Sequence, residues 1–254
     1  MHAFNHANEN SVSLECCQRL SCMAGLANGL IHELHNSLGA LRSNANALQL
    51  KKVKQNEQHF GYMQDALART HFLTEILRLY TRDSLVCIQT VKILPIIEDA
   101  LRSIQATPEF QNIECIWKHS PVRQHAVRTN QDLLHKAIYA LLQNACESLG
   151  PQKRQVILSL KENDQDVYHS GKMTMGCHVT GCSYLQVTIE DKGCGIPDGD
   201  IPCIFDPFYT TKMRAKGLGL AYVVGLVQKT NALLTCHTSL QKGTAFTLSL
   251  PMES

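Results

Sequence analysis

One apolar seam constrains the fold of this chain more than any other feature of its sequence. Small and apolar residues recur at steps of three and four, at Leu20, Ala24, Ala27, Ile31, Leu34, Leu38, Leu41, Ala45 and Leu48. This spacing places them along one side of a single helix, as in a heptad repeat. We therefore predict a long helix from about residue 12 to residue 50.

A second helix is predicted from about residue 57 to residue 82. The polar residues 51–57 can turn the chain, and the same steps then resume at Met63, Ala66, Thr70, Leu73, Leu77 and Tyr80. One helical hairpin cannot enclose the whole seam, so pairing of two copies into a dimeric four-helix bundle is the economical solution. Packing of the hairpin against a second domain of the same chain is the alternative. We assign residues 1–83 to this dimerisation domain.

The remaining residues, 84–254, mix helices and strands. Helices are predicted over residues 91–104, 132–149 and 218–229, and strands over residues 113–117, 125–128, 156–160, 185–190, 233–238 and 244–250. Residues 162–183 are expected to form a polar connection that is inserted at the surface as a hairpin, and residues 201–216 an irregular segment. This order predicts an α/β sandwich in which helices cover a sheet.

Composition and charge argue against several classes of protein. The 24 Lys and Arg residues nearly balance the 22 Asp and Glu residues, so no nucleic-acid partner is expected. No apolar run approaches the roughly 20 residues of a membrane-spanning helix, and no secretory signal is recognisable, so we expect a cytoplasmic protein. The 11 cysteines lack the spacing of a disulfide framework and are expected to be reduced. Cys177, His178, Cys182 and His169 lack the paired spacing of a zinc site.

His32 lies beside the seam of the first helix and points toward solvent. Glu33 is its neighbour, and Asn36 follows one helical turn later on the same face. A neutral imidazole is a competent nucleophile, and an adjacent carboxylate can accept or orient its other proton. These residues suit a phosphoryl acceptor, although a solvated helix face with incidental histidines gives the same pattern. Metal binding by His32 and His35 is disfavoured because no further carboxylate shares that face.

Two segments of the second domain suit the base and metal of a nucleotide. Asn144 and Glu147 lie on an otherwise apolar helix, where the Asn144 carboxamide oxygen could bind Mg²⁺. Asp191 follows a strand and supplies an acceptor carboxylate beside Gly193 and Gly195, which permit close approach by a flat ligand. A buried core asparagine and an ordinary strand-to-turn junction are the alternative explanations.

Two further segments suit the phosphates. An aromatic turn at residues 205–209 precedes two hydroxyls and the cation Lys212, as in a loop that covers phosphates. Backbone amides and the positive end of a helix can face a polyphosphate at Lys216, Gly217, Leu218 and Gly219. Thr244 adds a hydroxyl near the sheet. A plain hydrophobic turn and a tightly packed helix start are the alternatives.

The order of these segments resembles a known family. The stretches that carry the likeness are MAGLANGLIHELHNSL, LLQNACESL, DKGCGIP, IFDPFYTTK, KGLGL and KGTAFTLSLP. They resemble the H, N, G1, F and G2 boxes and the final strand of the two-component sensor histidine kinases. The motif sequences are most similar to those of the nitrogen-regulation-like branch. The resemblance implies a phosphoacceptor hairpin followed by an ATP-binding domain of the gyrase, Hsp90, histidine kinase and MutL type.

The resemblance also implies roles for individual residues. His32 would be the phosphoacceptor, Glu33 the base that activates it, and Asn36 the residue that positions water for dephosphorylation of a partner. Asn144 would hold Mg²⁺. The remaining roles concern ATP. Asp191 and Thr244 would lie next to the adenine, and Gly193 and Gly195 would shape the pocket for this base. The residues Lys212, Gly217 and Gly219 would bind the phosphates.

The predicted function is therefore an ATP-dependent protein-histidine kinase. It would phosphorylate His32 as a homodimer and relay the phosphoryl group to an aspartate of a response-regulator receiver domain. One alternative is a non-enzymatic histidine phosphotransfer protein with a degenerate nucleotide domain, and another is a related ATPase that drives clamp closure. The sequence departs from the resemblance at Ser37, which stands where the H box usually has proline and implies a less kinked helix.

Overall fold

The computed structural model describes residues 34–46, 56–80, 87–119, 126–150, 154–163, 173–176, 182–212, 215 and 217–252. The chain forms two compact units, Met1–Asp83 with Asp206–Phe208 and Ser84–Phe205 with Tyr209–Ser254. No helix within the described ranges combines the length and apolar character that crossing a membrane requires.

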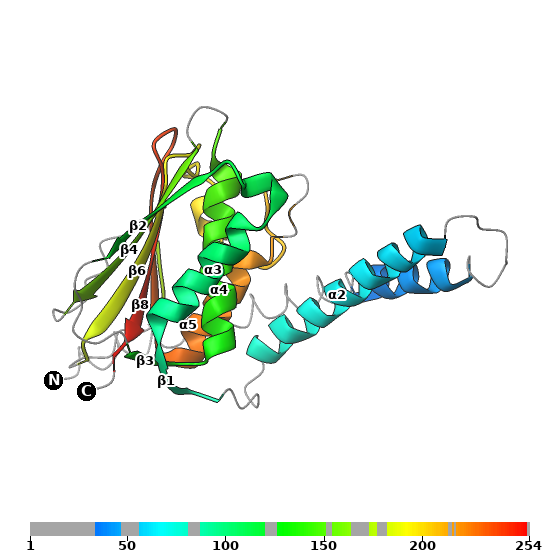
Figure 1. Cartoon of the computed structure of the whole chain (residues 1–254), viewed down its shortest axis with the longest axis horizontal. Helices are drawn as coiled ribbons and strands as arrows, with labels where there is room; N and C mark the ends of the chain where they lie inside the picture. The colour runs from blue at the N-terminus through cyan, green and yellow to red at the C-terminus, as the bar shows by residue number, and fades with distance from the viewer. Residues whose placement is uncertain are drawn as a thin grey trace, which may run out of the picture. The chain divides into compact units, whose positions relative to one another are not determined.

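The described residues of the N-terminal part of the first unit form two helices. Residues 34–46 are helical, and α2 spans Asn56–Tyr80 (Figure 1). The two helices are joined by a hydrogen bond between His59 Nδ1 and Asn44 Oδ1, 2.7 Å apart. Leu73 and Ile76 of α2 are buried, whereas several large apolar side chains of this unit are more than half exposed, namely Leu38, Phe60, Tyr62 and Leu67.

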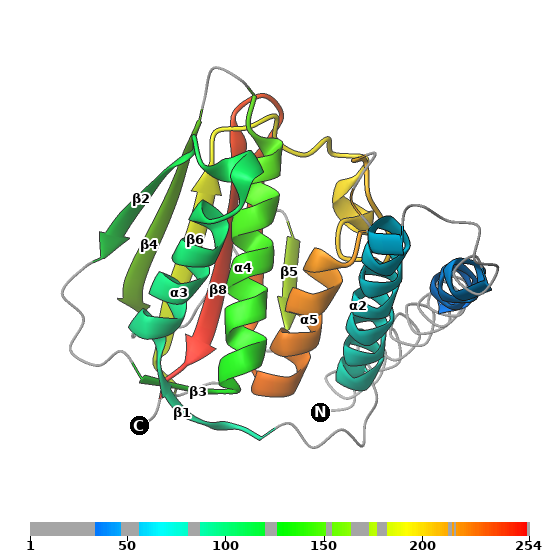
Figure 2. The ribbon, with the colours of Figure 1, turned by 45° about the vertical axis from the view of Figure 1, so that its right-hand side comes forward.

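A six-stranded mixed sheet forms the second unit, in the order β2-β4-β6-β8-β7-β5. The strands are β2 (Glu114–His119), β4 (Gln155–Asn163), β5 (Met173–Gly176), β6 (Tyr184–Asp191), β7 (Leu233–Ser239) and β8 (Gly243–Pro251). β2 and β4 are parallel, and all the other neighbours in the sheet are antiparallel. The helices α3 (Ile93–Gln105), α4 (Gln131–Ser148) and α5 (Gly219–Thr230) lie side by side over one face of this sheet (Figure 2). The predicted α/β architecture is confirmed.

Alternating side chains attach the central strands to the helices. In β4, Val156, Leu158 and Leu160 are buried, and the residues between them are half-buried. Because successive side chains of a strand point to opposite faces, these three residues lie on one face of the sheet. Burial of each contributes about 1.5–3 kcal/mol, so the face toward the helices forms the core.

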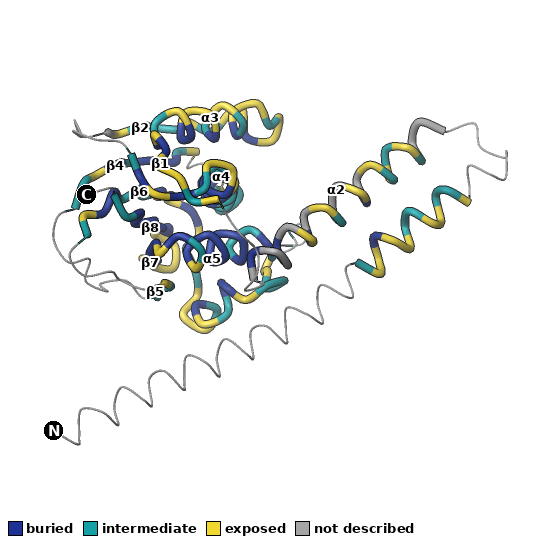
Figure 3. Tube along the Cα trace, turned by 90° about the horizontal axis from the view of Figure 1, so that it is seen from below, coloured by how far each residue is buried: buried dark blue, intermediate teal, exposed yellow. Residues whose placement is uncertain are grey.

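One end of α4 and one end of α5 are defined by local features of the chain. Asn130 caps α4, because its side-chain oxygen accepts a hydrogen bond from the Leu133 N–H at 3.0 Å. All residues from Ala221 to Val227 in α5 are buried, as the dark blue tube in Figure 3 shows. α5 ends at Asn231, whose left-handed φ of 52° terminates the helix.

Two sequence-based expectations are wrong. The helix predicted from residue 91 begins at Ile93, because Val91 belongs to the strand β1 (Gln89–Lys92), which pairs with β3 (Ala126–Thr129). The surface hairpin insertion predicted over residues 162–183 contains the end of β4 and the short strand β5, and β5 belongs to the main sheet, where it pairs with β7 at the edge. β1 reads Gln-Thr-Val-Lys and lacks the alternation by which strands are recognised, and β5 is short, with only the four residues Met-Thr-Met-Gly.

Candidate functional site

Asp191 lies at the end of β6 and is only 4% exposed. Its Oδ1 accepts a hydrogen bond from the Gly193 N–H at 2.8 Å. Burial raises the pKa of Asp191, while hydrogen bonds from Gly193, Ser148 and Thr244 and the charge of Lys212 act in the opposite direction. The site therefore holds a desolvated carboxyl group, which favours a hydrogen-bonding partner.

The glycines after Asp191 let the chain pass close to its neighbours. A side chain at Gly193 would collide with Ser148, and one at Gly195 with the Ser239 carbonyl. Gly195 also has a φ of +68°, which L side chains rarely adopt. The sequence suggested that these glycines make room for a ligand. In the structure, the space that they leave is occupied by α4 and by the end of β7.

Hydrogen bonds hold this glycine loop, residues 192–197, from two sides. The Cys194 N–H donates to the Ser148 carbonyl at 3.2 Å, and the Gln241 N–H donates to the Cys194 carbonyl at 2.7 Å. The Ile196 N–H donates to Thr238 Oγ1 at 2.9 Å. The loop is thereby fixed between the last turn of α4 and the β7–β8 turn.

Thr244 is buried beside the glycine loop, where it pairs in register with Asp191. Its hydroxyl lies 3.0 Å from the hydroxyl of Thr238 on the neighbouring strand. Sequence reasoning found Thr244 but missed Thr238 and Ser148. The pairing of Thr238 with Thr244 would have followed from the hairpin register of the last two strands, whereas a serine at a helix end carries no distinct signal.

Asn144 lies on α4 opposite the start of α5. A Cβ atom at Gly219, the first residue of α5, would stand 3.9 Å from Asn144 Nδ2 and 3.7 Å from the Ala140 Cβ. The chain turns into this helix at Gly217, where φ is +66°. The first backbone amides of a helix lack intrahelical partners and attract anions. The α5 start therefore brings anion-binding amides next to a carboxamide.

Lys212 and Glu147 are also brought together. Lys212 Nζ lies 2.7 Å from Glu147 Oε2, and the two side chains are 35% and 24% exposed. The other Glu147 carboxylate oxygen accepts a hydrogen bond from Gln143 Nε2 at 2.8 Å. Thr210 Oγ1 accepts a hydrogen bond from the Lys212 N–H at 3.1 Å, which closes a short turn before the lysine.

The donor set fits a magnesium nucleotide. Among the described residues, the Asn144 side chain has no hydrogen-bond partner, so its carboxamide oxygen is available to a cation. No group of three or more His, Cys, Asp or Glu residues suited to a metal occurs in the described parts of the chain. Magnesium bound with a nucleotide takes most of its ligands from phosphates and water, so one protein oxygen is sufficient.

Other predicted residues fall elsewhere. His32, Glu33 and Lys216 lie outside the described residues. Asn36 is exposed on the helix of residues 34–46, in the first unit. Of the four residues considered for zinc, only Cys182 is described, and it is half-buried.

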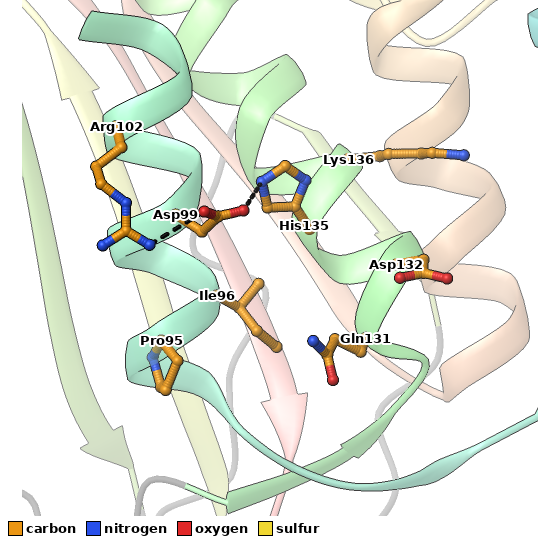
Figure 4. Close-up of a pocket in the computed structure, with 8 residues that line it drawn as sticks. All are labelled: Pro95, Ile96, Asp99, Arg102, Gln131, Asp132, His135 and Lys136. Carbon is orange, nitrogen blue, oxygen red and sulfur yellow. Dashed lines mark hydrogen bonds and ion pairs between the residues drawn. The ribbon is translucent and has the colours of Figure 1, made fainter. Parts of the chain in front are cut away.

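A separate cavity of about 440 Å³ lies between α3 and the first turns of α4 (Figure 4). Asp99 lies there between the side chains of Arg102 and His135, 3.1 Å from Arg102 Nη2 and 3.0 Å from His135 Nε2. The cavity is lined by Pro95, Ile96, Asp99, Arg102, Gln131, Asp132, His135 and Lys136. None of the predicted nucleotide-binding residues lines it, so it is distinct from the site around Asp191 and Asn144.

Comparison with known proteins places this site in a family. Residues 129–254 match the family described as "Histidine kinase-, DNA gyrase B-, and HSP90-like ATPase". Sporulation kinase A of Bacillus subtilis is 27% identical over 93% of this chain and 36% of its own length. The sensory histidine kinase/phosphatase NtrB of Rhizobium leguminosarum bv. phaseoli is 25% identical over 90% of this chain and 58% of its own. The chain thus spans about a third to somewhat over half of the length of these relatives.

Solved structures show the same fold. The Acinetobacter baumannii histidine kinase AdeS has a TM-score of 0.60 and 18% identity, covering 88% of this chain and 98% of AdeS. The mycobacterial sensor histidine kinase MprB has a TM-score of 0.50 and 23% identity, covering 65% of this chain and 97% of MprB. The family match lies on the α/β unit that holds Asp191, Asn144 and Gly219. The chain therefore carries the ATP-binding core of a sensor histidine kinase.

Proposed function

We propose that this protein is an ATP-dependent protein-histidine kinase that phosphorylates its own His32 and passes the phosphoryl group to an aspartate of a response regulator. The observation that carries the proposal is the convergence of four features on the C-terminal half of α4. These are the buried Asp191 carboxyl, the Asn144 carboxamide, the amides at the start of α5 and the Lys212 cation. Together they supply one group suited to each part of a magnesium nucleotide.

In this function each residue has a limited task. Asp191 accepts a hydrogen bond from the adenine amino group, with Thr244 next to it. Asn144 holds Mg²⁺, which neutralises phosphate charge when it is bound. Lys212 and the amides of residues 217–219 orient the phosphates. Phosphoryl transfer of this kind depends on positioning and charge neutralisation more than on covalent chemistry.

The first unit would supply the acceptor. His32 would attack the γ-phosphorus, and Glu33 would accept or orient the proton on the other imidazole nitrogen. Asn36 would orient water in the reaction that removes phosphate from the regulator. Asn36 is exposed on its helix, as a contact with a partner protein requires.

A homodimer through the hairpin is part of the proposal. Leu38 and Leu67 are 55% and 61% exposed in a single chain, and Phe60 and Tyr62 add to the exposed apolar surface. Apolar surface of this kind marks interaction sites. Pairing of two hairpins into a four-helix bundle about a two-fold axis would cover it. The proposed location is the cytoplasm, where ATP and a receiver domain are both accessible.

Labelling with Mg-ATP tests the function. The wild-type protein is expected to acquire a phosphate that is labile to acid and stable to alkali, and His32→Gln is expected to abolish it while leaving nucleotide binding intact. His35→Gln is the matched control and should retain labelling. Undiminished labelling of His32→Gln would rule out the acceptor. A wild-type protein that binds no nucleotide would instead favour the non-enzymatic phosphotransfer function.

A further inference from the structure

Asp191, Thr244 and Thr238 form one row across three neighbouring strands of the sheet. Asp191 of β6 pairs with Thr244 of β8, and Thr244 pairs with Thr238 of β7. Paired residues of neighbouring strands point to the same face, and Asp191 also pairs with Val156, which is buried on the face toward the helices. The three polar side chains therefore lie on that face, where they are 4%, 5% and 7% exposed.

Thr238 has three hydrogen-bonding partners. Its Oγ1 accepts a hydrogen bond from the Ile196 N–H of the glycine loop at 2.9 Å, and it lies 3.3 Å from the Gly243 carbonyl oxygen and 3.0 Å from Thr244 Oγ1. Among the described residues, the Thr244 hydroxyl bonds only to Thr238. Thr238 is thus the residue through which the sheet orients the Thr244 hydroxyl.

The number of available protons determines the direction of these bonds. A threonine hydroxyl has one proton to donate and accepts with its lone pairs. The Gly243 carbonyl only accepts, so Thr238 donates to it when all three bonds are formed. Thr244 must then donate to Thr238, and only lone pairs of Thr244 Oγ1 are left for a ligand. In the opposite arrangement Thr238 donates to Thr244, and the Gly243 carbonyl loses this donor.

We propose that Thr238 is a positioning residue for base recognition, which holds the Thr244 hydroxyl as an acceptor beside the Asp191 carboxyl. This role rests on the proposed function, in which Asp191 and Thr244 lie next to the adenine. Two acceptors in one row suit the amino group of adenine, because that group has two N–H donors. Hypoxanthine, the base of inosine, has a carbonyl oxygen in place of this amino group and would place an acceptor against both side chains.

Removal of the Thr238 hydroxyl releases the Thr244 proton. Thr238→Val has a similar shape, and Thr244 Oγ1 can then rotate to donate to a carbonyl or to accept from an amino group. Discrimination between ATP and inosine triphosphate should therefore fall. The Ile196 N–H also loses its acceptor in this variant, which loosens the glycine loop and weakens the binding of both nucleotides alike.

Titration calorimetry with ATP and with inosine triphosphate gives the ratio of the two dissociation constants for the full-length chain. Wild type is expected to favour ATP, and Thr238→Val should reduce the ratio about fivefold, as expected for the net loss of one hydrogen bond. Thr238→Ser keeps the hydroxyl and should keep the wild-type ratio. Thr235→Val is the matched control, because Thr235 is also buried on β7 but points to the opposite face.

Two further variants show whether Thr238 acts through Thr244. Thr244→Val should also lower the ratio, and the double variant Thr238→Val with Thr244→Val should lower it no further than Thr244→Val alone. Thr238→Cys takes the place of Thr238→Val if thermal melts show that the valine variant does not fold, because a thiol is only a weak donor and acceptor.

The outcomes separate this role from the proposed function. If Thr238→Val weakens the binding of both nucleotides equally and leaves the ratio unchanged, Thr238 only holds the glycine loop and the inference is overturned. A fall of the same size in Thr235→Val would overturn it as well. If wild type binds neither nucleotide, the proposed function fails and base recognition fails with it. Failure of the inference alone leaves ATP binding and the labelling of His32 intact.

Discussion

Lys212 Nζ is 2.7 Å from Glu147 Oε2. The lysine that is expected to bind phosphate is therefore paired with a carboxylate of α4. Glu147 is held in place in turn by Gln143, whose Nε2 donates to its other oxygen at 2.8 Å. A phosphate group must compete with Glu147 for the same cation.

Replacement of Glu147 by glutamine removes this competition. We expect Glu147→Gln to bind ATP about twofold to fivefold more tightly, since a partly exposed ion pair contributes roughly 0.2–1 kcal/mol. Lys212→Met should weaken binding. The double variant should resemble Lys212→Met, because Glu147 then has no cation to withhold. Calorimetric titration measures all three, and weaker binding by Glu147→Gln would show that the carboxylate itself contributes to the ligand site.

The substitution Asp191→Asn is expected to have different effects on the stability of the fold and on the binding of ATP. Burial raises the pKa of Asp191 above 3.8, so the folded state holds this proton more tightly than the unfolded state does. The resulting stabilisation is present at low pH and is lost as the pH rises from 3.8 through the raised value. At neutral pH we therefore expect Asp191→Asn without nucleotide to melt no lower than wild type.

The nucleotide should have the opposite effect on this variant. The carboxamide introduced by Asp191→Asn would direct a donor toward the donor amino group of adenine, so ATP should no longer raise the melting temperature. Thermal melts at several pH values, with and without Mg-ATP, measure both effects. A large loss of stability in the variant without nucleotide would contradict the dominant role of burial.

Gly195→Ala tests the packing of the glycine loop. Its φ of +68° and the collision with the Ser239 carbonyl should together cost at least about 2 kcal/mol in the free energy of unfolding. Gly199→Ala is the matched control, because nothing lies within 4 Å of its added Cβ. Thermal denaturation should show a fall of roughly 4–8 °C for the first variant. Equal melting temperatures would contradict the close contact.

The exposed leucines of the first unit test the dimer. Leu38→Glu and Leu67→Glu should each weaken self-association at least about tenfold, because burial of one leucine contributes roughly 1.5–3 kcal/mol. Leu240→Glu is the control, since Leu240 is 57% exposed in the other unit, on the β7–β8 turn. Sedimentation equilibrium gives the dissociation constants, and an unchanged dimer in both hairpin variants would refute this interface.

The sequence predicted the long elements of the α/β unit well. The helix expected over residues 132–149 is α4, Gln131–Ser148, because its apolar period is regular and Asn130 supplies a cap. By contrast, neither β1 nor the place of β5 in the main sheet was predicted. Each has four residues and is stabilised by a partner far along the chain, as Val91 is by Val127. Local periodicity contains no information about such a partner.

The candidate site was predicted only in part, because a local sequence pattern does not show contacts between residues that are far apart in the chain. Asp191, Asn144 and Lys212 were recognisable from their chemistry and order. The contacts that hold them were not, because Ile196 and Thr238 are 42 positions apart and Cys194 and Ser148 come from different elements. The role of Gly195 also changed, since its missing side chain accommodates a backbone carbonyl of the protein.

The glycine loop is anchored to α4 through Cys194 and to the β7–β8 turn through Gln241 by the protein's own hydrogen bonds. A surface that is preorganised in this way loses little conformational entropy on binding. The base of a nucleotide therefore binds to a loop that already has its final conformation. Discrimination among bases should then depend on shape and hydrogen-bond polarity at Asp191 and Thr244. An adenosine-like compound without phosphates would lose the charge contacts and still be selected over its guanosine counterpart.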